Sequence, residues 1–186
     1  MNVLAVIPAR ENSKRIPNKT LRLVNNHPLI YYVIKNALES KYISRIIVTT
    51  NSKEIEILCN QLGVECLIRN PALCTDDTTL DAVVYDVVRR CECDYVVTLQ
   101  PTSPLLKVDS LDRAIEKMMA DKLDTLISVV NYPRLRGIKD ETGVVPTYKE
   151  RVNSQYLRPH YQETGAFIIS KKNVTTELTR IGEKVD

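Results

Sequence analysis

Short apolar runs alternate with segments of helical periodicity along most of this chain. The runs are rich in β-branched residues and end in turn or polar residues, as buried parallel strands do; they cover residues 3–7, 45–50, 64–68, 95–99 and 125–130. Apolar residues recur at helical spacing in 29–38, 53–62, 80–89 and 110–119, the last with Asp109 as its expected N-cap. This alternation predicts an open, mostly parallel α/β sheet with helices on both faces, which binds ligands at the carboxyl ends of its strands.

The alternation is interrupted after residue 130. Residues 131–140 are rich in Pro, Arg and Gly, and 143–150 are expected to form a hairpin arm, so the segment 131–160 is predicted to leave the sheet. A strand is expected again at 165–169, followed by a short helix at 171–178. The length of 186 residues fits a single domain over 1–186.

Composition excludes several classes of protein. No apolar run approaches the roughly 20 residues that span a bilayer, and the net charge of +3 is small and dispersed, so neither a membrane nor a nucleic acid is expected as a partner. Five cysteines form no paired framework, which favours the reducing cytoplasm; Cys91 and Cys93 are interpreted as structural rather than metal-binding.

The loop at 8–20 follows the first strand directly and is the strongest functional signal. It holds four cations, two prolines and no glycine. Cationic donors at a strand end suit a triphosphate, and prolines would stiffen the loop before a ligand arrives. The absence of glycine excludes a Walker A loop and a dinucleotide fingerprint. The alternative is a solvated basic surface turn. The cations are Arg10, Lys14, Arg15 and Lys19.

The run Ile7-Pro8-Ala9-Arg10-Glu11-Asn12-Ser13-Lys14-Arg15-Ile16-Pro17-Asn18-Lys19 resembles the N-terminal signature of the acylneuraminate cytidylyltransferases. The resemblance implies a nucleotide-diphospho-sugar transferase fold, Rossmann-like, with a protruding dimerisation arm. It also implies that the CTP phosphates are held by a catalytic set of Arg10, Lys14 and Lys19, with further CTP contacts from Ala9, Ser13 and Thr20. Thr20 stands where the family usually has Asn.

A second stretch, residues 69–76, is similar to the family's Arg-Pro-x-x-Leu-x-x-Asp segment and implies that Arg69, Asp76 and Thr79 contact CTP, with Arg69 reading cytosine. The alternative for Arg69 is a surface ion pair with Asp76 or Asp77. Asn51 replaces a carboxylate that the family commonly has after its second strand, and we interpret it as a cap for the helix near residue 53.

A third signature, Leu99-Gln100-Pro101-Thr102-Ser103-Pro104-Leu105, closes the strand 95–99. By resemblance, Gln100, Thr102 and Ser103 would contact the sugar; the alternative is a proline-bounded turn that caps the next helix. Residues 161–169 are similar to the family's later Asn-Gly-Ala strand, with Thr164 for the Asn. Arg158 is the candidate for the sugar carboxylate.

The implied reaction transfers CMP from CTP to the anomeric hydroxyl of a sialic-acid-like nonulosonic sugar and releases pyrophosphate. Activation of pseudaminate, legionaminate or 3-deoxy-octulosonate stays open, as does a non-catalytic CTP-binding role. The resemblance implies Mg²⁺ and a homodimer formed through 131–160. The family's metal-binding Asp-x-Asp motif does not occur in this sequence, so the metal ligands are unknown and the chain is expected to be truncated before that motif.

Overall fold

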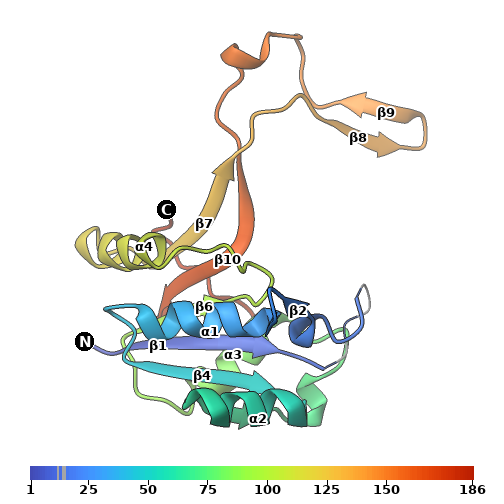
Figure 1. Ribbon diagram of the computed structural model, residues 1–186. Coiled ribbons are helices and arrows are strands. Elements are labelled where there is room, and N and C mark those ends of the chain that lie inside the picture. The colour runs from blue at the N-terminus through green and yellow to red at the C-terminus, as the bar shows by residue number, and fades with distance from the viewer. Residues whose placement is uncertain (12, 14–15) are drawn as a thin grey trace. The chain divides into compact units, whose positions relative to one another are not determined.

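The computed structural model describes residues 1–11, 13 and 16–186 (Figure 1). Within them, six strands form one sheet in the order β5-β4-β1-β6-β10-β7. β1 pairs in parallel with β4 and β6, β4 pairs in parallel with β5, and β10 runs antiparallel to β6. The mostly parallel α/β sheet is therefore confirmed. The strands are β1 (Val3–Ala9), β4 (Arg45–Thr50), β5 (Glu65–Ile68), β6 (Tyr95–Leu99), β7 (Thr125–Asn131) and β10 (Tyr161–Lys171).

Helices cover both faces of the sheet, because alternate residues of β1 point into different cores. Val3, Ala5 and Ile7 belong to a hydrophobic cluster that includes buried side chains of α1, α2 and α4. Leu4 and Val6 belong to a second cluster with α3. Each fully buried aliphatic side chain of this kind stabilises the fold by about 1.5–3 kcal/mol. The helices are α1 (Leu29–Glu39), α2 (Lys53–Leu62), α3 (Leu80–Val88) and α4 (Val108–Ala120).

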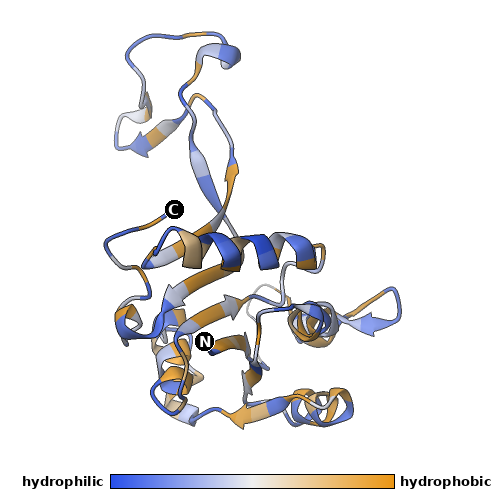
Figure 2. Ribbon diagram, turned by 90° about the vertical axis from the view of Figure 1, so that its left-hand side faces the viewer, coloured by the Kyte–Doolittle hydropathy of each residue, from blue (hydrophilic) through white to orange (hydrophobic). Residues whose placement is uncertain are grey.

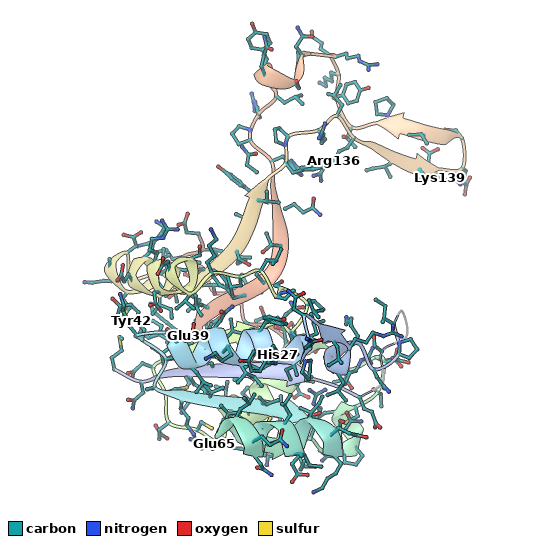
Figure 3. The ribbon with its side chains drawn as sticks, viewed as in Figure 1. His27, Glu39, Tyr42, Glu65, Arg136 and Lys139 are labelled. Atoms are coloured by element: carbon teal, nitrogen blue, oxygen red, sulfur yellow. The ribbon has the colours of Figure 1, made fainter. Side chains whose placement is uncertain are left out.

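The hydropathy of the ribbon follows this arrangement (Figure 2). The central strands are drawn largely in hydrophobic colours, whereas the helices carry both hydrophobic and hydrophilic residues. The segment that follows α1 also contacts α4: Tyr42, which lies beneath α4 in Figure 3, donates from its hydroxyl to Glu116 of α4. No helix of the described residues is long and apolar enough to cross a membrane.

Two local predictions are wrong. Asp109 does not cap α4, because the helix begins at Val108 with Lys107 as its N-cap and Asp109 lies in the first turn. The helix expected at 171–178 is only a 3₁₀ turn, η4 (Lys172–Val174). The Thr176 hydroxyl accepts hydrogen bonds from the backbone N–H groups of Leu178 and Thr179, and such local bonds compete with helix formation.

Residues 128–164 form a compact unit of their own, separate from the unit of residues 1–127 and 165–186. Its hairpin consists of β8 (Gly137–Asp140) and β9 (Gly143–Pro146). The first strand of the hairpin therefore lies before residue 143, where the hairpin was expected to begin. Asp140 accepts from the Thr142 backbone N–H at 2.7 Å, and Gly143 has a φ of 131° that favours glycine. The short elements are β2 (Leu23–Val24), β3 (His27–Pro28), η1 (Lys19–Leu21), η2 (Pro71–Leu73) and η3 (Ser154–Tyr156).

Candidate functional site

The loops that follow β1, β4, β5 and β6 all leave the same edge of the sheet, because these strands are parallel neighbours. β1 and β4 visibly point the same way in Figure 1. The register pairs Pro8 with Thr49 and Ala9 with Thr50, so the residues that follow, Arg10 and Asn51, emerge side by side. The three stretches singled out in the sequence therefore meet at the carboxyl edge, where open α/β sheets bind ligands.

The first cavity at this edge, here the central hollow, has a volume of about 350 Å³. Cationic and neutral polar groups line it together, which suits a ligand with phosphates and hydroxyls. Its lining residues are Pro8, Arg10, Ser13, Lys19, Thr20, Leu80, Gln100, Pro101 and Thr102.

A second cavity of about 210 Å³, here the Arg69 hollow, lies next to the first. Pro8, Arg10 and Leu80 line both cavities, so the two hollows are neighbours with Arg10 at the junction between them. The Arg10 side chain therefore borders both hollows. The remaining lining residues are Arg69, Leu73, Thr75, Asp76, Thr78, Thr79 and Val83.

Arg69 is buried, with 5% of its surface exposed, so the alternative of a surface ion pair is wrong. Its Nη2 donates to the Thr49 carbonyl oxygen at 2.7 Å, and its backbone N–H donates to the Thr50 carbonyl at 2.7 Å. Burial lowers the pKa of the Arg69 guanidinium, and the nearby positive charge of Arg10 lowers it further. A buried cation that lines a cavity favours a ligand with acceptor oxygens or nitrogens there.

Arg10 is the residue that pairs with Asp76: its Nη1 donates to Asp76 Oδ1 at 2.9 Å. The side chains of both residues are more than a third exposed. The contact ties the loop after β1 to the loop before α3, and it lies where the two hollows meet.

Asn51 does not cap α2, because Ser52 occupies the N-cap position and α2 begins at Lys53. The Asn51 side-chain oxygen instead accepts from the backbone N–H of Glu11 at 3.0 Å. Asn51 therefore holds the start of the cationic loop. Sequence reasoning missed this role because the adjacency of Arg10 and Asn51 follows from the β1–β4 register, which the sequence does not display.

The hydroxyl groups of Thr20 and Thr79 differ in their hydrogen bonds. Thr20 is 7% exposed, and its Oγ1 has no hydrogen-bond partner among residues 1–11, 13 and 16–186. Thr79 is the N-cap of α3 and accepts from the Ala82 backbone N–H at 3.2 Å, which leaves its O–H free to donate to a ligand. Both therefore remain candidates for ligand contacts.

The proline-bounded turn after β6 presents Gln100 and Thr102 to the central hollow. Ser103 closes this turn by donating its backbone N–H to the Gln100 carbonyl at 3.3 Å. The alternative that the turn caps α4 is wrong, because Lys107 is the N-cap. β10 holds the start of this turn, because the Gln100 backbone N–H donates to the Ala166 carbonyl at 3.1 Å.

The other predicted residues lie elsewhere or stay untested. Lys14 lies outside the described residues, and Ala9 packs in the hydrophobic core, so only its backbone is available to a ligand. Arg158 belongs to the unit of residues 128–164. Leu80 and Pro8, which form the shared wall of the hollows, were not singled out as site residues. Their apolar character gave no signal by itself.

Among the described residues, no group of three or more His, Cys, Asp or Glu side chains is placed to hold a metal ion. Asp76 is engaged with Arg10. The described side chains therefore form no dedicated all-protein site for Mg²⁺.

A family model described as cytidylyltransferase matches residues 4–174. The chain belongs to the cytidylyltransferase family. Within this family, it is 38% identical over 122 residues to the CMP-N,N'-diacetyllegionaminic acid synthase of Legionella pneumophila, covering 62% of this chain and 53% of the relative. It is 31% identical over 185 residues to an N-acylneuraminate cytidylyltransferase of Streptococcus agalactiae, covering 92% and 44%. The chain thus spans about half the length of these two relatives.

Another family member, the pseudaminic acid cytidylyltransferase of Campylobacter jejuni, is 31% identical over 179 residues and is covered over 77% of its length. Among solved structures, a CMP:2-keto-3-deoxy-manno-octonic acid synthetase complexed with CTP matches with a TM-score of 0.77 and 18% identity, covering 99% of this chain and 80% of that one. The 4-diphosphocytidyl-2C-methyl-D-erythritol synthase of Anaerococcus prevotii matches with a TM-score of 0.68 and 14% identity, covering 93% and 71%. These structural matches establish the shared fold.

Proposed function

We propose that this chain transfers CMP from CTP to the anomeric hydroxyl of an acidic nonulosonic sugar and releases pyrophosphate. The observation that carries the proposal is the pair of neighbouring hollows with Arg10 at their junction. One hollow has a buried cation, and the other has cations beside neutral polar groups. A nucleoside triphosphate and an acceptor sugar need this sequence of environments.

The Arg69 hollow is the proposed base site. Cytosine presents acceptors at O2 and N3, whereas N3 of uracil carries a hydrogen, and the buried Arg69 supplies guanidinium donors that the Thr49 carbonyl holds in place. Thr79, with its O–H available, lines the same hollow. The Arg69 hollow therefore offers donors to the acceptor edge of the base.

The phosphates would lie at Arg10 and Lys19, with Lys14 and Ser13 contributed by the same loop. In the reaction, the anomeric oxygen of the sugar forms a bond to the α-phosphorus, and the bond from that phosphorus to the pyrophosphate oxygen breaks. Positioning of the reactants and stabilisation of the developing charge dominate such chemistry. The cations of this loop would perform both tasks.

The sugar would lie against Gln100 and Thr102, whose amide and hydroxyl groups match hydroxyl and acylamino substituents. Relatives of this chain are named for legionaminic, N-acylneuraminic and pseudaminic acids, which supports a nonulosonic acid as the acceptor. Ser103 and, for the sugar carboxylate, Arg158 stay predictions.

Three further parts of the proposal concern the setting of the enzyme. Mg²⁺ would neutralise phosphate charge, but we derive no step through it because the described side chains form no dedicated all-protein site for it. The described part includes all five cysteines as free thiols, which supports a reducing compartment such as the cytoplasm. A homodimer through the unit 128–164 is supported by its exposed apolar side chains, among them Ile138, Val144, Tyr156 and Tyr161.

Pyrophosphate release tests the proposal. The chain is incubated with CTP, Mg²⁺ and one acid at a time from a panel of N-acetylneuraminate, diacetyllegionaminate, pseudaminate and 3-deoxy-octulosonate. We expect release with CTP and a nonulosonic acid and none with UTP, ATP or GTP. CTP binding without release across the panel would contradict the transferase and favour a nucleotide-binding role.

A further inference from the structure

The ion pair between Arg10 and Asp76 sets an anion against a cation that the proposed function assigns to phosphate. Nη1 of Arg10 and Oδ1 of Asp76 are 2.9 Å apart, within the range of a charge-assisted hydrogen bond. Asp76 lines the Arg69 hollow, whereas Arg10 lines both hollows. The carboxylate therefore meets Arg10 from the base side of the junction.

The position of this contact identifies which phosphate it concerns. In a nucleoside triphosphate, the α-phosphate lies between the base with its ribose and the β- and γ-phosphates. If the base occupies the Arg69 hollow, the α-phosphate lies at the junction, next to Arg10. The Asp76 oxygen thus accepts, in the free protein, a hydrogen bond that suits an α-phosphate oxygen.

We infer that Asp76 is a place-holder for the α-phosphate, which keeps the Arg10 side chain directed into the junction until the nucleotide displaces it. This inference rests on the proposed function. A carboxylate left beside a bound phosphate would repel it, so the exchange sets the affinity for cytidine nucleotides. Because both side chains are partly exposed, the pair is weak enough for a ligand to break.

Asp76→Asn removes the charge and keeps the shape of the side chain. By the range measured for exposed ion pairs, we expect its Kd for CTP to fall by about two- to fivefold. The Kd for CMP, which has the α-phosphate alone, should fall similarly, and the Kd for cytidine should not change. Asp76→Ala serves as a second variant and should shift the three affinities in the same directions.

Asp77→Asn is the matched control, since it removes the same charge from the neighbouring exposed residue. Calorimetric titrations of the full chain with CTP, CMP and cytidine, without divalent metal, give the three affinities for each variant. If Asp76 is a place-holder, Asp76→Asn should bind CTP and CMP more tightly than wild type, and Asp77→Asn should bind them with wild-type affinity.

Four results would overturn the inference. Weaker or unchanged CTP binding by Asp76→Asn would mean that Asp76 stays on Arg10 as a positioning residue. An equal gain in affinity from Asp77→Asn would mean that any nearby negative charge weakens CTP binding. A gain in affinity for cytidine would mean that the effect of Asp76 does not depend on a phosphate. A wild-type chain that binds none of the three ligands would overturn the proposed function as well, whereas the other results leave that function standing.

Discussion

Arg10 and Arg69 show how surroundings divide the work of two identical side chains. Arg69 is buried and held by the Thr49 carbonyl, whereas Arg10 is partly exposed and held by a carboxylate. A fixed, buried guanidinium suits the reading of a neutral base, because its donors keep one geometry. A partly exposed guanidinium suits a phosphate, because its partner can be exchanged.

Arg69→Lys tests the fixed geometry. A lysine has one ammonium group and cannot both hold the Thr49 carbonyl and reach the base in the way a guanidinium fork does. We expect the Kd for CTP to rise about tenfold, which corresponds to about 1.4 kcal/mol, and the preference for CTP over UTP to shrink. Calorimetry with both nucleotides measures this, and an unchanged CTP affinity would remove Arg69 from the base site.

Asn51→Ala tests the anchor of the cationic loop. Loss of the acceptor for the Glu11 N–H costs about 1 kcal/mol, so CTP binding should weaken about fivefold through a less ordered loop. Asn51→Asp keeps an acceptor oxygen in place and should bind CTP more tightly than Asn51→Ala does. Equal affinities of the two variants would show that the contact does not position the loop.

At this scale the sequence predicted residue types better than partners. Arg10, Lys19, Thr20, Arg69 and Gln100 all line the two hollows. The partner of Arg10 and the role of Asn51 were not predicted, because both depend on which loops become neighbours in space. The spacing of motifs along the chain does not show which loops become neighbours in the folded protein.

The helix α3 is the element that joins the site to the fold. Its first residue, Leu80, lines both hollows. Near its other end, the Asp86 carboxylate accepts hydrogen bonds from Arg89 Nη2 at 2.7 Å and from Arg90 Nη2 at 2.8 Å. Asp86 is buried, and Val84 and Val87 pack against the sheet. Stability of this helix thus bears on the shape of the site.

Asp86 makes the stability of this element depend on pH. Burial alone would raise the pKa of Asp86, but hydrogen bonds from Arg90 and Arg89 hold it below its usual value. A lowered pKa in the folded state stabilises the protein above the unfolded pKa of about 3.9, and this stabilisation is lost as the pH falls through the folded pKa.

Asp86→Asn should therefore lower the free energy of unfolding by about 1.5–3 kcal/mol at pH 7, and the difference from wild type should shrink as the pH falls below about 4. Urea unfolding across this range measures it, with the exposed Glu141→Gln as a control for net charge. A difference that does not vary with pH would contradict the assigned pKa direction.

Elements were predictable where one periodicity was strong and local. The ranges 45–50, 53–62 and 95–99 coincide with β4, α2 and β6. Buried strands and amphipathic helices were predictable because their burial produces a regular pattern of apolar residues along the sequence. The prediction of a helix at 171–178 was wrong, because the hydroxyl of Thr176 accepts local backbone hydrogen bonds that compete with helix formation. The start of the hairpin at Gly137 was missed, because exposed strands have no apolar alternation to read.

At the scale of the whole molecule, the unit 128–164 is the part with a distinct surface. Ile138 is 66% exposed and Val144 74% exposed, and both belong to its hairpin. Exposed apolar side chains gathered on one hairpin favour burial against a partner. The proposed partner is a second copy of this chain.

Ile138→Glu combined with Val144→Glu should convert a dimer into a monomer, because charges at a buried apolar contact are costly. Sedimentation velocity gives the mass of each species, and Leu178→Glu, at an even more exposed apolar residue outside this unit, should leave the mass unchanged. A wild-type chain that sediments as a monomer at all concentrations would contradict the proposed dimer.

Hydrogen exchange on addition of CTP tests the central claim most directly, because it locates the ligand on the sheet. We predict slower exchange of amides in residues 9–13 and 69–79. The hollow lined by Cys93, Asp94, Tyr95, Lys171 and Lys172 is an internal reference, and its amides should not change. Protection confined to that reference hollow, or no protection at saturating CTP, would contradict a cytidine nucleotide site at the carboxyl edge.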